Sequence, residues 1–163
     1  MLDRIIQEAP RFFTYYNMIF ILKAMGTTLL LTALGCVTGF IFGFIIAAIR
    51  STRARILLPV RLLVTFYVEI FRRIPFLVIL FIVMFAIQVV SRNVSLFTIA
   101  VISICLLSTA FLSEVIRAGV ESVPRQQVEA AETLNFGFWR TQFHVILPQS
   151  WKVIIPPAFA FMV

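Results

Sequence analysis

The chain has 163 residues, of which 61% are hydrophobic and 13% are charged, and 18 of them are phenylalanine. A soluble domain of this size has too little interior to bury so much apolar surface, so the composition excludes a soluble globular protein and indicates a membrane protein. The formal net charge of +7 is explained by cationic loops beside membrane spans, and it does not indicate nucleic-acid binding.

Residues 1–22 are predicted to form an N-terminal surface segment. A cleavable signal peptide is excluded, because Asp3 and Glu8 interrupt the stretch where its apolar core would lie. Ile5 and Ile6 alternate with polar residues, which is typical of a short helix lying on a membrane surface.

The first membrane span is predicted from Ala24 to Ile49, because this stretch carries no charge and exceeds the roughly 20 residues that cross a bilayer core. Gly35, Gly39 and Gly43 recur every fourth residue and therefore lie on one helix face, where a neighbouring backbone can approach closely. Their spacing fits either ordinary helix packing or a subunit interface.

The second apolar stretch, 56–90, is long enough for one tilted or broken span plus an entry segment. Within it, Glu69 has the spacing to pair with Arg72 at i, i+3 and with Arg73 at i, i+4. Pro75 removes a helix hydrogen bond, so these charges are expected at a helix break. They form either a translocation-path or gate element, since charge at membrane depth is costly, or an anchor at the water interface.

The third span is predicted from Val94 to Leu112, which is again free of charge. Glu114 and Arg117 continue the helix out of the lipid as an i, i+3 pair, and Gly119 is expected to loosen it. A fourth apolar segment begins near Val153 and has covered only about half of the membrane when the sequence stops, so we expect truncation before a last helix.

The basic residues predict the orientation of the chain. Arg50, Arg53 and Arg55 follow the first span with no acid among them, so this loop is assigned to the cytoplasm. Two crossings later, residues 113–151 are also cytoplasmic, whereas the connection around Arg92 and the N-terminus face outside.

The polar insert before the last apolar segment is predicted to hold two helices. Pro124 is suited to the start of the first, which covers 125–134, because its missing N–H costs nothing in a first turn. The second covers 138–146 and is expected to be closed by Pro148. The residues expected to end the first helix tolerate a positive φ: Asn135 and Gly137.

The first of these helices is too short to persist in water without packing on something. Val128, Ala131 and Leu134 fall on one face that could contact the chain's own helices, while the small Ala130 leaves a shallow surface that another protein could approach. The insert is therefore predicted to be a docking surface.

The sequence shows no catalytic or metal-binding motif. Cys36 and Cys105 fall inside spans and are expected to be apolar fillers, and His144 is the single histidine. A phosphate loop, a His pair at metal spacing and a nucleophile elbow are all missing from the sequence.

The insert resembles the cytoplasmic loop signature of permease subunits of bacterial ABC importers. That signature is Glu-Ala-Ala, three residues, Gly, nine residues, and Ile-x-Leu-Pro. At the same spacing this chain has Glu129-Ala130-Ala131, then Asn135 in place of Gly, and then Val145-Ile146-Leu147-Pro148.

Two further segments resemble the polar amino-acid branch of that family. Phe71 to Leu77 is similar to its Phe-Arg-Gly-Thr-Pro-Leu-Leu, with Arg73 and Ile74 in place of Gly and Thr. Glu114 to Gly119 is similar to its Glu-Ile-Phe-Arg-Gly-Gly.

The resemblance implies an all-α, polytopic inner-membrane helical bundle of the type I importer permease kind, covering residues 23–163 with a cytoplasmic coupling loop at about 113–151. The residues it implies for ATPase coupling are Gln127, Glu129, Ala130, Ala131, Leu134, Asn135, Gly137, Leu147 and Pro148. The residues expected along the translocation path or at a gate are Glu69, Arg72, Arg73, Pro75, Glu114 and Arg117.

The resemblance also implies the partners. These are ABC ATPase subunits, a second identical or homologous permease subunit, and a periplasmic or lipid-anchored substrate-binding protein, with membrane lipid around the helices and no nucleic acid. This chain is expected to be no enzyme and to bind no cofactor, because ATP and Mg²⁺ belong to the ATPase. The alternatives are a secondary transporter or channel fragment with a regulatory loop helix, and a truncated remnant that does not transport.

Overall fold

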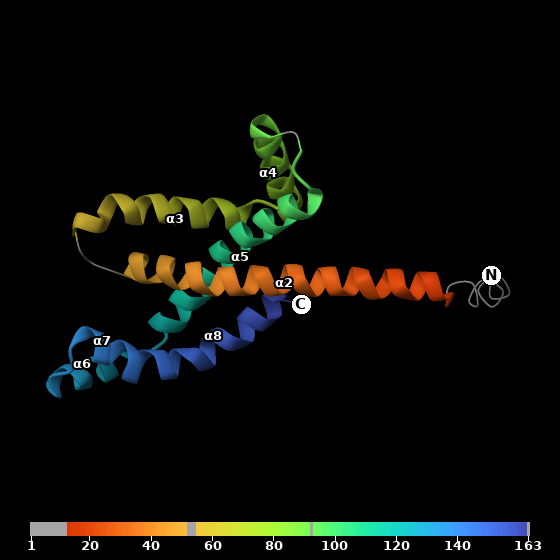
Figure 1. Ribbon diagram of the computed structural model, residues 1–163. Helices are drawn as coiled ribbons and strands as arrows, with labels where there is room; N and C mark the ends of the chain where they lie inside the picture. Colours follow the sequence, from red (N-terminus) through yellow and green to blue (C-terminus); the bar gives the residue numbers. More distant parts are fainter. Residues whose placement is uncertain (1–12, 52–54, 92, 163) are drawn as a thin grey trace.

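The protein is all-helical in the computed structural model, which describes residues 13–51, 55–91 and 93–162 (Figure 1). The predicted surface helix at residues 1–12, together with Arg53 and Arg92, lies outside the described residues. The elements in order are α2 (Tyr15–Ser51), the 3₁₀ turn η1 (Arg55–Leu57), α3 (Leu58–Arg73), α4 (Phe76–Val90), α5 (Leu96–Glu121), α6 (Arg125–Thr133), α7 (Phe138–Thr141), the π-helical turn η2 (Gln142–Ile146) and α8 (Leu147–Met162). The predicted fold class is confirmed.

Helix α2 is longer than the span predicted for it. It starts at Tyr15, so residues 15–22 of the expected surface segment continue the first helix. These residues are mostly apolar, and Lys23 alone cannot interrupt a helix that is apolar on both sides of it. At 1.5 Å per residue its 37 residues measure roughly 55 Å, more than the roughly 30 Å hydrocarbon layer.

The glycine face of α2 packs against α5. A Cβ atom on Gly39 would lie 2.6 Å from Leu112 Cδ1, and one on Gly43 would lie 2.9 Å from the backbone nitrogen of Ser113. The two backbones come this close only because the glycines have no side chain. Of the two readings of this face, the structure therefore shows helix packing within the chain.

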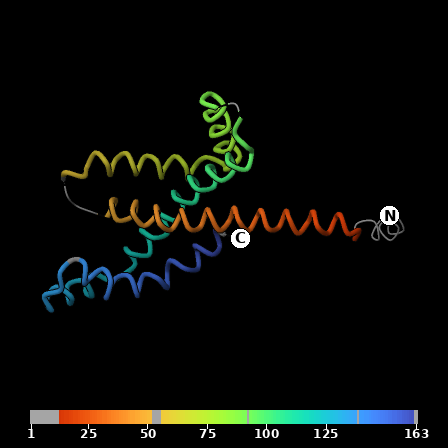
Figure 2. Tube along the Cα trace, viewed as in Figure 1, coloured from red at the N-terminus to blue at the C-terminus, as the bar shows by residue number. Residues whose placement is uncertain are grey.

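The register of this contact shows that α2 and α5 run in the same direction. Gly35 lies against Ile104, Gly39 against Leu112, and Ala47 packs with Ile116, so the contacted residues advance together along both helices. The intervening α3 and α4 must therefore return the chain to the side where α2 began, as Figure 2 shows.

The return is made by two helices joined at a sharp break. Helices α3 and α4 are joined by a bend of 117°. They are long and apolar enough to cross a membrane only as a pair, whereas α2 and α5 each qualify alone. Ile74 is extended (φ −87°, ψ 131°), as a residue before proline prefers, and Pro75 cannot donate the next helical hydrogen bond. The predicted break at Pro75 is confirmed.

Helix α5 lies at the centre of the molecule and contacts α2, α3, α4 and α8. It continues to Glu121, nine residues beyond the predicted span, and Gly119 is buried inside it. A Cβ atom on Gly119 would lie 2.3 Å from Ile154 Cγ1 of α8, so the expectation that Gly119 loosens the helix is wrong. The packing of α8 on α5 stabilises this last turn, and it requires a residue without a side chain at position 119.

The last three helical segments form one continuous run from Phe138 to Met162. Pro148 does not close a helix, contrary to prediction, and α8 begins at Leu147, ahead of the expected Val153. The turn before it is π-helical, with the Leu147 N–H bonded to the Gln142 carbonyl. A π turn widens the helix locally and so accommodates a proline that has no N–H to donate.

We predict that Gly43→Leu destabilises the chain by about 1–3 kcal/mol, because the new side chain meets the α5 backbone, which cannot move aside. The thermal unfolding midpoint of the purified chain in detergent measures this. Gly26→Leu on the same helix is the matched control, since a Cβ atom there has nothing within 4 Å. Equal midpoints for the two variants would contradict the packing role.

Candidate functional site

An ion-pair cluster lies where α2, α3 and α5 meet, and its centre is the Glu114 carboxylate. Arg50 Nη1 donates to Glu114 Oε2 at 2.7 Å, and Arg117 donates to both carboxylate oxygens. Their side chains are largely buried, with exposed fractions of 11% for Arg50 and 17% for Glu114. Because an unpaired charge in such surroundings is costly, these groups depend on each other.

Arg72 joins the same cluster from the end of α3. Its Nη1 lies 3.7 Å from Glu114 Oε1, and its guanidinium carbon lies 5.9 Å from the centre of the Phe111 ring. The predicted partner of Arg72 was Glu69, and this pairing is wrong. The end of α3 lies against α5, which offers Arg72 a carboxylate and an aromatic face together.

The predicted pair of Glu69 with Arg73 is present at 2.9 Å, but it lies at the surface, where the Arg73 side chain is 80% exposed. The two arginines of this segment therefore form ion pairs of different kinds. Arg72 reaches the cluster on α5 with its side chain 37% exposed, and its neighbour Arg73 faces outward just before the break at Pro75.

Arg50 is the site residue that sequence reasoning missed, since it was assigned to a loop. It is the last basic residue of α2 and continues the face of Gly39, Gly43 and Ala47 at helical spacing. The position of Arg50 on this helix face could be predicted from the sequence. What the sequence could not provide was the parallel register with α5, which places Glu114 opposite Arg50.

The helix predicted at 125–134 is present as α6, between α5 and α8. Pro124 precedes it with extended backbone angles (φ −59°, ψ 136°). Glu129 and Ala130 are exposed, and Ala131 is buried. Figure 1 shows α6 at the end of the molecule where α2 finishes and α3 begins, opposite the end marked N.

The C-terminus of α6 is fixed by a Schellman motif. The Phe136 N–H donates to the Ala131 carbonyl at 3.0 Å, and the Asn135 N–H donates to the Glu132 carbonyl at 2.9 Å. Asn135 adopts the left-handed conformation, with φ of 58°, as predicted for it. Gly137 has a negative φ, so the same prediction is wrong there: the Schellman motif needs a single left-handed residue, and the Gly137 carbonyl instead accepts the Thr141 N–H.

A groove of about 460 Å³ opens beside α6. Leu134, which was expected to pack on the chain's own helices, is 70% exposed and lines this groove. The left-handed turn that follows it directs the chain back toward α6, so Val145 of η2 takes the position against the helix. The residues lining the groove are Pro124, Gln126, Gln127, Ala130, Ala131, Leu134, Phe136 and Val145.

Helix α6 is tied to α8 by one side-chain hydrogen bond, which Gln149 of α8 donates to Gln127 of α6. Within α5, Arg117 Nη1 donates to Glu121 Oε2 at 2.6 Å, and Glu121 is the last residue of α5 before the turn that leads into α6. Leu147 and Pro148 lie in the first turn of α8, so the connection between α5 and α8 covers 122–146, shorter than the expected 113–151.

Within the described ranges, no group of three or more potential metal-ligating side chains gathers. Cys36 and Cys105 are free thiols, and His144 Nδ1 lies 3.2 Å from the Arg140 carbonyl oxygen of its own helix.

The site can now be compared with known proteins. Residues 39–163 match the family described as "Binding-protein-dependent transport system inner membrane component". The chain belongs to this family. Family membership agrees with the two helices, or three if α3 and α4 form one span, that are long and apolar enough to cross a membrane. The chain is therefore a multi-pass membrane protein.

Named relatives of this family member are transport proteins. The probable glutamine ABC transporter permease protein GlnM of Bacillus subtilis (strain 168) is 35% identical over 130 residues, covering 80% of this chain and 59% of the relative. The L-cystine transport system permease protein TcyB of the same organism is 38% identical over 130 residues, covering 80% and 54%. The chain therefore spans little more than half the length of these relatives.

A solved structure has a similar fold. It is titled "Crystal structure of an amino acid ABC transporter with histidines" and superimposes with a TM-score of 0.73 at 28% sequence identity, covering 88% of this chain and 69% of that chain. The arrangement of helices around α5 is thus that of an amino acid ABC transporter.

We predict that Glu114→Gln lowers the free energy of unfolding of this family member by about 3 kcal/mol, because Arg50 and Arg117 lose their counter-charge in a largely buried site. Glu69→Gln is the control, and it should cost under about 1 kcal/mol because its pair is exposed. Denaturation in detergent measures both. A cost for Glu114→Gln no larger than that of the control would overturn the account of the cluster.

Proposed function

We propose that this chain is a membrane-spanning permease subunit of an ATP-driven ABC importer for polar amino acids. The observation that carries the proposal is α6, a nine-residue helix between α5 and α8 with Glu129 and Ala130 exposed. The names of the relatives, which include glutamine and L-cystine permeases, support the substrate class.

In this proposal α6 docks into an ATPase subunit. Glu129 supplies the charged contact, the small Ala130 allows close approach, and the open groove beside Leu134 receives an apolar side chain of the ATPase. Asn135 and the ties of Gln127 to α8 hold the helix rigid, so that movement of the ATPase is passed to α5 and α8.

The mechanism is a population shift between outward-facing and inward-facing states. Nucleotide binding in the ATPase favours one state, and hydrolysis of ATP with Mg²⁺ there restores the other. Such a shift needs contacts that differ between the two states. The pair of Arg72 with Glu114, at 3.7 Å, is the longest ion pair of its cluster and is the candidate for such a contact.

The proposed path or gate lies at the elbow formed by α3 and α4. Glu69, Arg73 and Pro75 lie at the elbow itself, and Arg72 connects it to Glu114 and Arg117 on α5. A break in a membrane helix is tolerated where the backbone lines a protein or water-filled cavity, which supports this position for the path.

The complete assembly would contain a second permease subunit, identical or homologous, two ATPase subunits, and a periplasmic or lipid-anchored binding protein that delivers the amino acid. The N-terminus would lie outside the inner membrane. The end of α2, whose last turn carries Arg50, and helix α6 lie toward one end of the molecule, which supports a cytoplasmic position for that end.

Glu129→Arg is expected to abolish the coupling of ATP hydrolysis to uptake while insertion into the membrane stays intact, since it reverses an exposed charge on the docking helix. Glu132→Arg is the control: the same charge reversal on the same helix, outside the residues assigned to docking. Uptake and ATPase rates in proteoliposomes measure both. Normal transport by an assembled Glu129→Arg complex would disprove docking through α6.

Arg73→Gly is expected to change the KM for amino-acid uptake, because it removes an exposed cation beside the elbow and frees Glu69 from its pair. Arg73→Lys keeps the charge and serves as the control. Uptake kinetics identical to those of the unmodified complex would remove Arg73 from the path.

A further inference from the structure

The outward face of the helical run 138–162 carries an aromatic pair that the proposed function does not use. Trp139 and Phe143 stack with their ring centres 6.2 Å apart, and they are 71% and 55% exposed. Two aromatic side chains exposed together on a helix form an apolar surface that is costly in water, which raises the question of what covers it.

The groove beside α6, which the proposal assigns to ATPase docking, lies on the other side of this helical run. Val145 lines the groove and is two residues from Phe143 in the π-helical turn, so the two lie on roughly opposite sides of the helix. Thr141 is buried against the bundle and is likewise two residues from each aromatic residue, on the opposite side from both. The pair therefore points away from the groove and from the core together. The buried stripe that fixes this phase is Thr141, Ile146, Ser150, Ile154 and Ala158.

The charge of this helical run favours an anionic surface as the partner. Between Phe138 and Met162 it carries Arg140 and Lys152, both exposed, and no acidic residue. The neighbouring α6, by contrast, carries two glutamates in nine residues. Tryptophan beside basic residues is the composition of the headgroup layer, where aromatic rings sit at the boundary and cations meet lipid phosphates.

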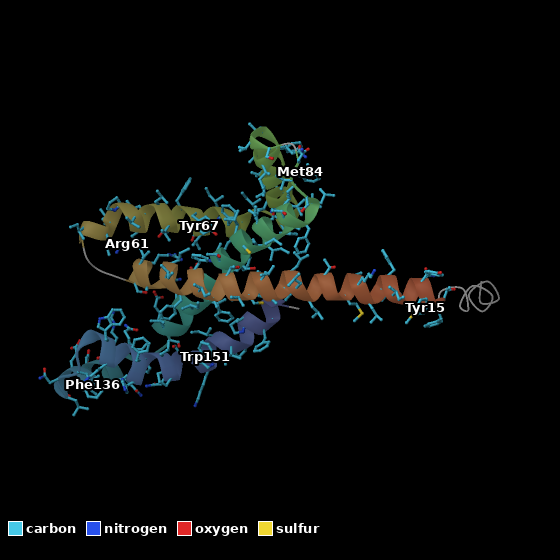
Figure 3. All side chains as sticks on the ribbon, in the orientation of Figure 1. Tyr15, Arg61, Tyr67, Met84, Phe136 and Trp151 are labelled. Carbon is cyan, nitrogen blue, oxygen red and sulfur yellow. The ribbon has the colours of Figure 1, made fainter. Side chains whose placement is uncertain are left out.

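The surface is continuous with apolar side chains farther along the same run. Val153 and Phe159 of α8 are exposed, as expected of lipid contacts. Figure 1 shows α7 at the end of the molecule where α2 finishes. In Figure 3, Trp151 of α8 lies between this end and the middle of the bundle. Its ring centre is 6.3 Å from that of Phe40 of α2.

We infer that Trp139 and Phe143, with Arg140 and Lys152, form a lipid anchor that seats the start of this helical run among the anionic phospholipid headgroups of the leaflet on the α6 side. Such an anchor would fix the height of α6 above the membrane. The inference rests on the chain spanning a membrane and does not depend on what the protein transports.

The test measures the depth of a nitroxide label at Phe143→Cys, in the assembled complex in nanodiscs, after Cys36→Ser and Cys105→Ser. Oxygen partitions into lipid and a nickel chelate stays in water, so the ratio of their collision rates reports immersion. Glu132→Cys on α6 is the aqueous reference, and Phe159→Cys on α8 is the reference in lipid.

The expected oxygen-to-nickel ratio at 143 is several-fold above that at 132 and below that at 159. In nanodiscs containing phosphatidylglycerol the label should also be less mobile than in phosphatidylcholine alone, and Arg140→Gln should abolish that difference. A ratio equal to that at 132 would show a surface facing water, and shielding from both reagents would show a protein partner. Either result overturns the anchor, and neither touches the test of ATPase docking.

Discussion

The pairing of Glu114 with Arg50 and Arg117 is the interaction on which the arrangement of the helices depends. It joins the end of α2 to the middle of α5 in a largely buried site, and it extends to Arg72 at the end of α3. Glycines on α2 make it possible, because without their close approach the arginine could not reach the carboxylate. Three helices are thereby held at one point, beside the elbow and about two turns before α5 ends.

This geometry connects the two halves of the proposed mechanism. Helix α6 is tied to α8 through Gln127 and Gln149, and within α5 Arg117 pairs with both Glu114 and Glu121, the last residue before the turn to α6. In the proposed mechanism, a displacement of α6 reaches α5 across the short turn 122–124, and the cluster on α5 contacts the elbow through Arg72. Rigid elements with discrete contacts transmit motion in this way, whereas a flexible loop would absorb it.

The local features were predictable, and the long-range ones were not. Composition and apolar run length indicated the membrane helices, and Pro75 and Asn135 revealed the elbow and the end of α6, because each acts through its own backbone. The pairing of Arg50, the continuation through Pro148 and the exposure of Leu134 depend on which helix lies alongside, and that information is absent from local spacing. The family signature pointed to the segment that forms α6, but it could not show that the preceding helix α5 carries an ion-pair cluster.

The central claim is that nucleotide in the ATPase shifts the elbow relative to α8. The most direct measurement is the distance distribution between spin labels at Phe85 on α4 and Phe159 on α8, both exposed, in the assembled complex. The account predicts two populations whose proportions change when ATP is bound and its hydrolysis is blocked. A single distribution that is the same with and without nucleotide, in a complex that hydrolyses ATP and transports, would contradict it.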